Sequence, residues 1–233
     1  MKIDIIILSW GKTKYLQNVT TNAVNTLLTS EYDTEIDFNI VVVESNLKLF
    51  PFQYENTKTI YLKNEKEFNY NRFCNIASKE ESAPYIGFFN NDVEFGERWA
   101  TNLIYYMRSK GLESASPYST YAMGNKLSSK PVLVGKRTRK ELLGWAIVVK
   151  REMFERIGGF DERVKFYCSD NIYEEQLKKH NIRHGLIMRS FVEHIGNHPS
   201  IMELSEAKKN KYLIGETKKF NRIFDKNILN YGK

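Results

Sequence analysis

The sequence has little cysteine and no long apolar run, and each shortage excludes a class of protein. Its two cysteines, Cys74 and Cys168, form no CxxC pair and cannot build a disulfide framework. We interpret both as reduced and structural. The longest apolar runs, such as Ile5–Leu8 and Ile40–Val43, are far shorter than the roughly 20 residues that a membrane span needs. We therefore expect no transmembrane segment.

Several well-known motifs are also missing. The chain has no GxGxxG after its first apolar run, no GxxxxGK[ST], no GxSxG and no HExxH. Dinucleotide oxidoreductases, P-loop NTPases, α/β-hydrolases and zincins therefore lose their main support. The first residues, Met-Lys-Ile-Asp-Ile, place an acid inside the first apolar run, and no small-residue cleavage site follows. This pattern argues against a secretory signal and favours a cytoplasmic protein.

The composition is that of a folded protein with an uneven distribution of charge. With 233 residues, 42% of them hydrophobic, the chain can form one large domain or one domain with an appendage. Lys and Arg exceed Asp and Glu by seven over the whole chain. Between Lys126 and Arg151 there are eight basic residues and one acid, Glu141. The net charge of this segment therefore equals the net charge of the whole chain. Two interpretations are open: a surface that meets an anionic partner, or a solvated basic loop.

Short apolar runs alternate with amphipathic stretches through the first half of the chain. We expect strands at residues 3–8, 38–43, 59–62 and 85–89, and helices over 16–27, 70–77 and 99–107, where apolar residues recur at three- and four-residue spacing. Later, 142–149 and 184–188 read as strands, 172–179 as a helix, and the chain from 201 as polar and helical. The alternation predicts an α/β domain with a mainly parallel sheet covered on both faces.

Polar clusters follow three of these strands: Ser9-Trp10-Gly11, Glu44-Ser45-Asn46 and Asn90-Asn91-Asp92. Because the carboxyl ends of parallel strands meet at one edge of a sheet, we expect the clusters to line one crevice. Asp92 is a candidate oxygen ligand for Mg²⁺ or Mn²⁺, which prefer such ligands. The alternative is that Asp92 caps the helix expected after Glu97.

The stretch Tyr85–Glu94 resembles the strand and acidic turn of GT-A-fold glycosyltransferases. The resemblance is to the large family-2-like group that includes bacterial rhamnosyltransferases and other polysaccharide-building enzymes. Further segments resemble that family in order and spacing, namely 3–10, 41–46, 71–77, 144–162, 166–173 and 194–200. The resemblance implies a GT-A (Rossmann-like) nucleotide-sugar-binding domain over 1–200, with a nucleotide-sugar half (1–95) and an acceptor half (96–200). Residues 201–233 are left as a C-terminal helical appendage.

The resemblance also implies roles for particular residues. The donor side would comprise Ser9, Trp10, Glu44, Asn75, Asn90, Asn91 and Asp92, with Glu44 hydrogen-bonding the nucleoside. Asp92 and His194 would hold a divalent cation, Mn²⁺ or Mg²⁺, and Asp170 would be the catalytic base. Trp145 would form an apolar platform for a sugar or base. The structural alternatives stay open: an N-cap for Asp170, a satisfied structural histidine for His194 and a core position for Trp145.

Two departures from the family pattern affect the site. The metal motif Asn90-Asn91-Asp92 lacks its first acid, and the second strand ends in Glu-Ser-Asn where the family more often has Asp-Asn-x-Ser. The implied activity is metal-dependent, inverting transfer from a nucleotide sugar, most simply a UDP sugar, to an acceptor hydroxyl. Lys136, Arg137, Arg139 and Lys140 would face the acceptor, which favours an anionic one: a modified base in DNA, or a phosphate-bearing polymer or lipid-linked glycan. The alternative function is a non-catalytic nucleic-acid-binding module that retains the fold.

Overall fold

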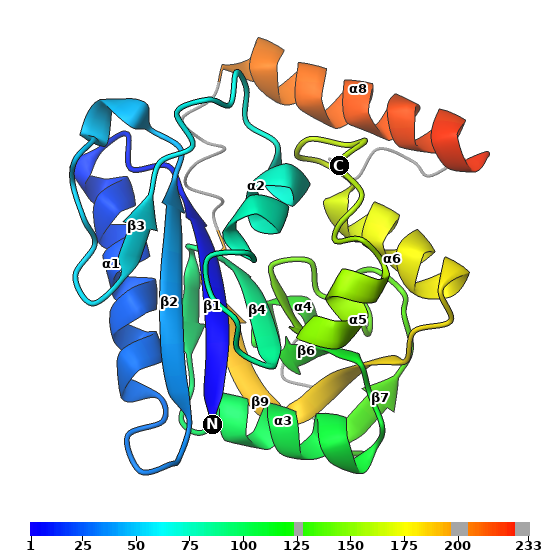
Figure 1. Ribbon diagram of the computed structural model, residues 1–233. Coiled ribbons are helices and arrows are strands. Elements are labelled where there is room, and N and C mark those ends of the chain that lie inside the picture. The colour runs from blue at the N-terminus through cyan, green and yellow to red at the C-terminus, as the bar shows by residue number, and fades with distance from the viewer. Residues whose placement is uncertain (124–127, 197–204, 227–233) are drawn as a thin grey trace.

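The first half of the chain forms the parallel part of a central sheet (Figure 1). The computed structural model describes residues 1–123, 128–196 and 205–226. Strand β1 (Lys2–Ser9) lies between β2 (Asp37–Glu44) and β4 (Tyr85–Asn90), and β3 (Lys58–Ile60) pairs with the outer edge of β2, all in parallel. Ile5 pairs with Ile40 on one side and Gly87 on the other. The unbroken apolar run of β1 suits this central position, because both of its faces are covered.

The second half of the sheet is mixed. Its strands are β5 (Val93–Phe95), β6 (Ser114–Tyr118), β7 (Val132–Val134), β8 (Ala146–Lys150) and β9 (His184–His194). Strand β8 runs antiparallel to both β4 and β6, whereas β9 is parallel to β6 and is flanked by antiparallel β5 and β7. The sheet order is β3-β2-β1-β4-β8-β6-β9-β5. Because β8 is reversed, it begins at the edge where β4 ends, so Trp145 lies next to Asn90.

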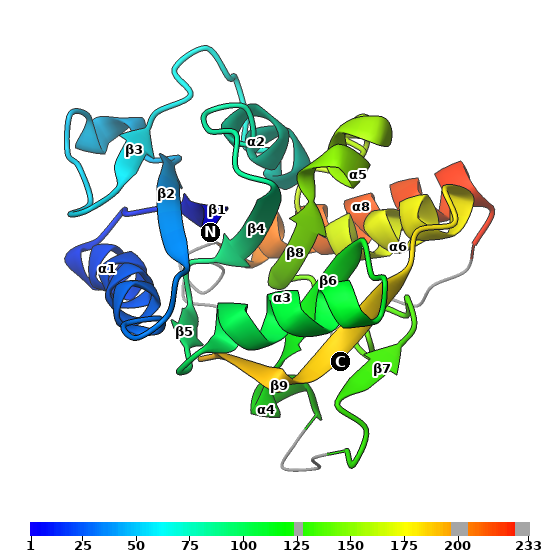
Figure 2. The same cartoon turned by 60° about the horizontal axis from the view of Figure 1, so that its bottom comes forward.

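Helices cover both faces of the sheet, as the sequence predicts (Figure 2). Helices α1 (Lys14–Thr29) and α3 (Trp99–Ser109) bury residues such as Leu27 and Trp99 against Ile5 and Ile7 of β1. Helices α2 (Tyr70–Ala77), α5 (Arg151–Arg156) and α6 (Ser169–Lys179) pack on the opposite face, against Ile6 and its neighbours. The short elements η1 (Leu47–Leu49) and α4 (Thr120–Met123) follow β2 and β6. Alternate residues of β1 therefore enter two separate cores.

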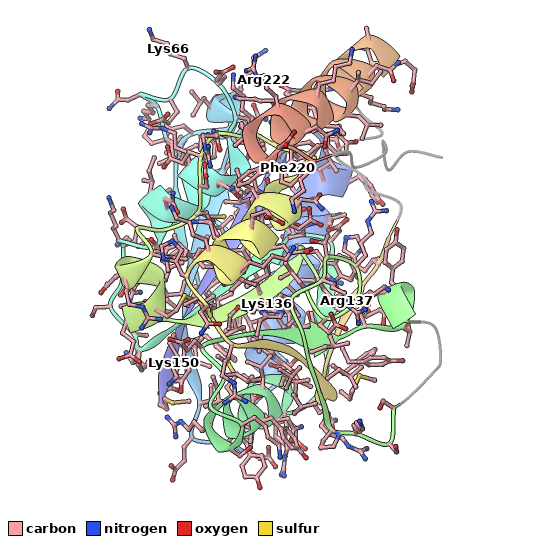
Figure 3. All side chains as sticks on the ribbon, turned by 90° about the vertical axis from the view of Figure 1, so that its right-hand side faces the viewer. Lys66, Lys136, Arg137, Lys150, Phe220 and Arg222 are labelled. Carbon is pink, nitrogen blue, oxygen red and sulfur yellow. The ribbon has the colours of Figure 1, made fainter. Side chains whose placement is uncertain are left out.

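The C-terminal helix α8 (Glu206–Phe224) packs on the loop that leads into α6. Phe220 is 2% exposed and packs against Val164, Cys168 and Ile172, and Figure 3 shows its side chain between α8 and α6. The carboxylate of Glu216 accepts a hydrogen bond from the Lys165 backbone N–H at 2.6 Å. The expected helical tail is thus tied to the segment before Asp170. Across the described ranges, no helix has both the length and the apolar character needed to cross a membrane.

A buried polar group links the sheet to α6. The Ser114 hydroxyl lies 2.8 Å from His184 Nδ1, and the Tyr173 hydroxyl donates to Ser114 at 2.9 Å. His184 Nε2 lies 3.0 Å from the carbonyl oxygen of Glu141, which can only accept, so Nε2 carries a proton. Burial lowers the pKa of His184 to about 4.

We expect this histidine to make the fold sensitive to acid. The native pKa of about 4 is below the ordinary 6.5, so the contribution of His184 is complete above pH 6.5 and is lost as the pH falls toward 4. The free energy of unfolding should fall by about 2 kcal/mol between pH 7 and pH 5 from this group alone. Urea unfolding at each pH measures the fall. His184→Asn should flatten the slope, whereas the exposed control His180→Gln should keep it. Equal slopes in His184→Asn and the wild type would contradict the assignment.

Candidate active site

The polar ends of β1, β2 and β4 are joined by hydrogen bonds. Asn91 Nδ2 donates to Thr20 Oγ1 at 2.9 Å, and the hydroxyls of Thr20 and Ser9 are 2.9 Å apart. Ser9 in turn donates to Glu44 Oε2 at 2.8 Å. The three clusters expected from the sequence therefore converge at one edge of the sheet.

Glu44 does not have the role that we expected. Its side chain is 0% exposed, so it presents nothing to a nucleoside. Besides Ser9, its carboxylate accepts hydrogen bonds from the Tyr54 hydroxyl at 2.9 Å, from Asn46 N at 2.7 Å, and from Gly11 N at 3.0 and 3.1 Å to its two oxygens. The expectation of a direct nucleoside contact is corrected: Glu44 holds the two turns that follow β1 and β2.

The turn after β1 requires glycine and leaves one aromatic side chain partly exposed. A Cβ on Gly11 would lie 2.6 Å from Leu49 Cδ1 and 2.9 Å from the Tyr54 hydroxyl, so a larger residue does not fit. Ser9 is buried, whereas Trp10 is partly exposed, with the Lys12 ammonium 5.3 Å from its ring centroid. Of the residues expected to meet the donor, Trp10 and Asn90 keep partial exposure, whereas Asn91 and Asp92 are buried.

Asn75 is also engaged inside the protein. Its Nδ2 donates to the Phe160 carbonyl at 2.8 Å and to Glu162 Oε1 at 2.9 Å, and its Oδ1 accepts from Phe160 N at 2.8 Å. A Cβ on Gly159, whose φ is +82°, would lie 2.7 Å from Asn75 Oδ1. The amide therefore clamps α2 to the Gly158-Gly159 turn, and the side chain expected to meet the nucleotide stays partly exposed.

Asp92 and His194 face each other at the end of β4. Val93 pairs with His194 across β5 and β9, and this pairing places His194 Nε2 3.2 Å from Asp92 Oδ1. Asp92 is 5% and His194 2% exposed. The turn itself is held by the backbone, because Ile195 N donates to the Asp92 carbonyl at 3.0 Å. This backbone contact does not involve the Asp92 side chain.

The alternative that Asp92 caps the next helix is wrong. Helix α3 begins at Trp99, and its N-cap is Arg98. The first backbone donors of α3, Ala100 N and Thr101 N, bind Glu31 Oε1 at 2.8 and 3.1 Å. Glu31, from the segment after α1, therefore satisfies the donors that were the structural alternative for Asp92.

The Asp92 and His194 pair fits a metal site that is completed by water or substrate better than one made only of protein ligands. Within the described ranges, no group of three or more His, Cys, Asp or Glu side chains is placed to hold a metal ion. A structural zinc site needs four such ligands, and the pair does not supply them. Mg²⁺ is commonly held by one or two protein carboxylates together with water and substrate phosphates, and Mn²⁺ shares this preference for hard oxygen ligands. The pair fits a cation shared with a bound diphosphate.

Trp145 lies directly against this pair. Its ring stacks on His194, with centroids 4.8 Å apart and an interplanar angle of 23°. Its position follows from the sheet, because the Asn90 N–H donates to the Trp145 carbonyl at 2.9 Å. Among the residues that the structure describes, the buried indole Nε1 has no hydrogen-bond partner. Buried indole N–H groups normally find one, which argues against an ordinary core tryptophan.

Asp170 is in the first turn of α6, beside Trp145. The N-cap of that helix is Cys168, with φ +65°, so the N-cap alternative for Asp170 is wrong. Its Oδ1 accepts from Asn171 N at 2.9 Å. A Cβ on Gly144, the residue before Trp145, would lie 2.7 Å from Asp170 Cβ and 3.3 Å from Oδ2. Burial raises the pKa of the Asp170 carboxyl above its usual value.

Tyr70 is a site residue that sequence reasoning treated only as part of a helix face. Its backbone N–H donates to the Lys165 carbonyl at 2.6 Å, at the start of α2. Burial raises the pKa of Tyr70 well above its usual value, and after the neighbouring Cys74 the charges of Asp170 and Asp92 add to this shift. The negative charges of Asp170 and Asp92 thus both act on the Tyr70 hydroxyl. A tyrosine at the first position of a predicted helix was the only available signal.

The basic segment is largely bound to α6. Lys136 Nζ donates to the Leu177 carbonyl at 3.0 Å, and Arg137 forms an ion pair with the buried Glu141. Figure 3 shows Lys136 beside α6. The expectation that Lys136 faces the acceptor is therefore corrected, whereas the Arg137 side chain remains 63% exposed beside Glu141. Arg139, with φ +62°, and Lys140 are exposed at the tip of the turn. The positive charge of Arg139 reaches Asp170 and opposes the effect of burial on the pKa of that carboxyl.

A separate cavity of about 650 Å³ lies away from these residues. It is lined by the Gly158-Gly159 turn, the second half of α6 and Phe224. None of Asp92, Asp170, Trp145 or His194 borders it, so its chemistry is not that of the candidate site.

Comparison with known proteins shows the fold and leaves the family open. The sequence matches no protein-family profile and no curated protein. Among solved structures, the chain is similar to S. aureus TarS residues 1–349, with 13% identity and a TM-score of 0.57, over 97% of this chain and 72% of that chain. TarS is a glycosyltransferase with a GT-A-like fold. At this identity the likeness concerns architecture alone, and it confirms the predicted α/β, GT-A-like fold class.

Proposed function

We propose that this protein is a glycosyltransferase that moves a sugar from a nucleotide sugar to an acceptor hydroxyl. The observation that carries the proposal is the joint placement of two acidic centres around one short segment. Trp145 stacks on His194, which faces Asp92, and the adjacent Gly144 makes room for Asp170. The Asp92 and His194 pair and the half-buried Asp170 carboxylate thus lie next to the Gly144-Trp145 segment, in a fold shared with a glycosyltransferase. The proposed donor is a UDP sugar.

Asp92 and His194 would assist departure of the diphosphate. When bound, Mn²⁺ or Mg²⁺ supplies positive charge that stabilises the oxygens of the leaving diphosphate. The protein's part is to hold the two ligands in register, which the β5 and β9 pairing and the Trp145 ring do. Glu44 contributes indirectly, by holding the turns from which Trp10 and Asn46 would approach the nucleoside.

Asp170 would accept the proton of the acceptor hydroxyl. A carboxylate whose pKa is raised by burial is a stronger base than an exposed one. The hydroxyl oxygen then attacks the anomeric carbon as the bond to the diphosphate breaks. A single displacement of this kind inverts the anomeric configuration.

A direct assay tests this proposal. The purified protein, with Mn²⁺ and a panel of UDP sugars, should release UDP slowly by hydrolysis and faster when a suitable acceptor is added. Binding of UDP, measured by calorimetry with and without Mn²⁺, reports on the site independently of the sugar. Neither UDP binding nor UDP release from any sugar nucleotide in the panel would contradict the proposed donor class.

The acceptor surface is proposed to be anionic and to involve Arg139 and Lys140. The Lys136 ammonium is bound to the Leu177 carbonyl, whereas Arg137 keeps an exposed side chain beside Glu141. A phosphate-bearing glycan or DNA would approach Asp170 from the side of the exposed turn. In this arrangement the charged turn meets the acceptor, whereas the donor lies at the ends of β1, β2 and β4.

Replacing both Arg139 and Lys140 with serine should weaken binding of an anionic acceptor and flatten its salt dependence. The slope of log affinity against log salt should become shallower by about one for each phosphate that the variant no longer neutralises. The matched control is Lys2→Ser with Lys110→Ser, which removes two exposed charges outside the basic segment. Fluorescence anisotropy with labelled DNA and with a phosphorylated glycan measures both slopes, and UDP affinity should stay unchanged. An unaltered slope for both probes would exclude this turn as the acceptor surface.

A further inference from the structure

An exposed aromatic ring lies beside the Asp92 and His194 pair. Tyr121, on α4, is 52% exposed, yet its ring meets His194 edge-on, with centroids 4.9 Å apart and an angle of 70°. The same ring meets Trp145 edge-on at 5.8 Å and 84°. Tyr121 and Trp145 therefore form adjoining walls next to the proposed metal ligands, and one of these walls is open to solvent.

Helix α4 is anchored by the residue that precedes His194. The carboxylate of Glu193 accepts from Thr120 N at 2.9 Å, Thr120 Oγ1 at 2.7 Å, Tyr121 N at 2.9 Å and Ser119 Oγ at 3.2 Å. Figure 2 shows α4 lying against β9, the strand that carries Glu193 and His194. The position of the Tyr121 backbone is thus coupled to the strand that carries the proposed metal ligand.

Gly196 leaves room for the Tyr121 ring. It has φ +76°, and a Cβ at this position would lie 3.0 Å from Tyr121 Cε2. A side chain there would be strained by the backbone and would press on the ring. Tyr121 is therefore placed by three independent features: the Glu193 anchor, the His194 and Trp145 rings, and the glycine opposite.

We propose that Tyr121 and Trp145 form a subsite that binds the apolar face of a pyranose ring. Such a ring has a flat C–H face that loses contact with water when it packs on an aromatic side chain, while its hydroxyl rim stays available for hydrogen bonds. The open Tyr121 ring, which lies edge-on to Trp145 and His194, offers that surface. The subsite rests on the proposed glycosyl transfer and specifies what it would hold: the sugar, not the nucleotide. Glu193 acts as a positioning residue for Tyr121.

Tyr121→Ala should weaken sugar binding while leaving UDP binding unchanged. Calorimetry with Mn²⁺ gives the affinities for UDP and for UDP-glucose, and steady-state rates give the KM of a phosphate-bearing glycan acceptor. We expect either the affinity for UDP-glucose to fall about tenfold or the acceptor KM to rise about tenfold. Each change corresponds to about 1.4 kcal/mol. A loss for UDP-glucose identifies the donor sugar as the occupant, and a rise in acceptor KM identifies the acceptor sugar. Tyr121→Phe, which keeps the ring, should change either quantity less than about threefold.

The controls separate this inference from the function proposal. Tyr105→Ala removes a 63% exposed tyrosine from α3 and should behave like the wild type in every arm. Glu193→Gln should raise the same quantity as Tyr121→Ala, either the dissociation constant for UDP-glucose or the acceptor KM, while kcat stays within about twofold of the wild type. In the double variant this quantity should rise no further than in Tyr121→Ala alone. Unchanged sugar affinity and acceptor KM in a folded Tyr121→Ala would overturn the subsite alone. A parallel loss of UDP affinity would also overturn it, since Tyr121 would then contact the nucleotide. Failure of the wild type to bind UDP would overturn both proposals.

Discussion

Replacing Asp92 with alanine should reduce sugar transfer by about a hundredfold to a thousandfold, the usual range for loss of a group that stabilises transition-state charge. The carboxylate lies 3.2 Å from His194 Nε2 and supplies the negative charge of the proposed cation site. Without it, His194 alone would hold the cation weakly, because Mg²⁺ and Mn²⁺ favour oxygen ligands. The leaving diphosphate would then separate with little compensating positive charge.

The variant should remain folded, and this allows a clean measurement. The turn after β4 depends on the Asp92 carbonyl, which accepts from Ile195 N at 3.0 Å, and alanine keeps that carbonyl. UDP release at saturating Mn²⁺ gives the turnover, and calorimetry gives the Mn²⁺ affinity of each protein. Glu94→Ala is the matched control, because Glu94 is an exposed acid two residues away. Chelation of the wild type should reproduce the loss, and wild-type turnover in excess chelator would refute metal dependence.

The first half of the fold was predictable because its apolar patterns are strong. Strands β1, β2 and β4 each contain a short apolar run, and α1 and α3 repeat apolar residues at helical spacing. The second half was not. Strand β6 reads Ser-Ala-Ser-Pro-Tyr, is fully buried and carries no apolar run that could reveal it. The strand expected at 142–149 begins only at Ala146, because Leu142 closes a turn on the Arg137 carbonyl.

The site residues divide in the same way. Position at a strand end singled out Asp92, and the family resemblance singled out Asp170. An acid that faces a ligand nevertheless looks the same in sequence as one that faces its own loop. Glu44 belongs to the second kind, because the backbone N–H groups of Gly11 and Asn46 turn toward it. Whether Glu44 faces a ligand or its own loop depends on the conformation of those turns. The pairing of β5 with β9 that joins Asp92 to His194 likewise depends on two strands far apart in the chain.

Replacing Asp170 with asparagine should lower kcat by about a hundredfold or more, the usual size of a general-base effect, with little change in donor affinity. Asparagine keeps the shape and can still accept from Asn171 N through Oδ1, so the first turn of α6 should be preserved. What is lost is the acceptor of the proton. The wild-type kcat should also fall on the acid side of a pKa above the usual 3.8, since burial raises the pKa of Asp170, and this limb should vanish in the variant.

Gly144→Ala tests the same carboxylate without changing its chemistry. The added Cβ would lie 2.7 Å from Asp170 Cβ and 3.3 Å from Oδ2, so the carboxylate must shift while remaining a base. We expect kcat to fall by less than in Asp170→Asn and the acid limb of the pH profile to persist. The control Ser169→Ala removes only a hydroxyl that donates to the Phe166 carbonyl at 3.0 Å, and its kcat should stay near that of the wild type. If Asp170→Asn kept the wild-type kcat, Asp170 would have only a structural role in the first turn of α6. Another group would then have to accept the proton. Tyr70, whose phenol lies within the field of both acids, would then be the next residue to replace.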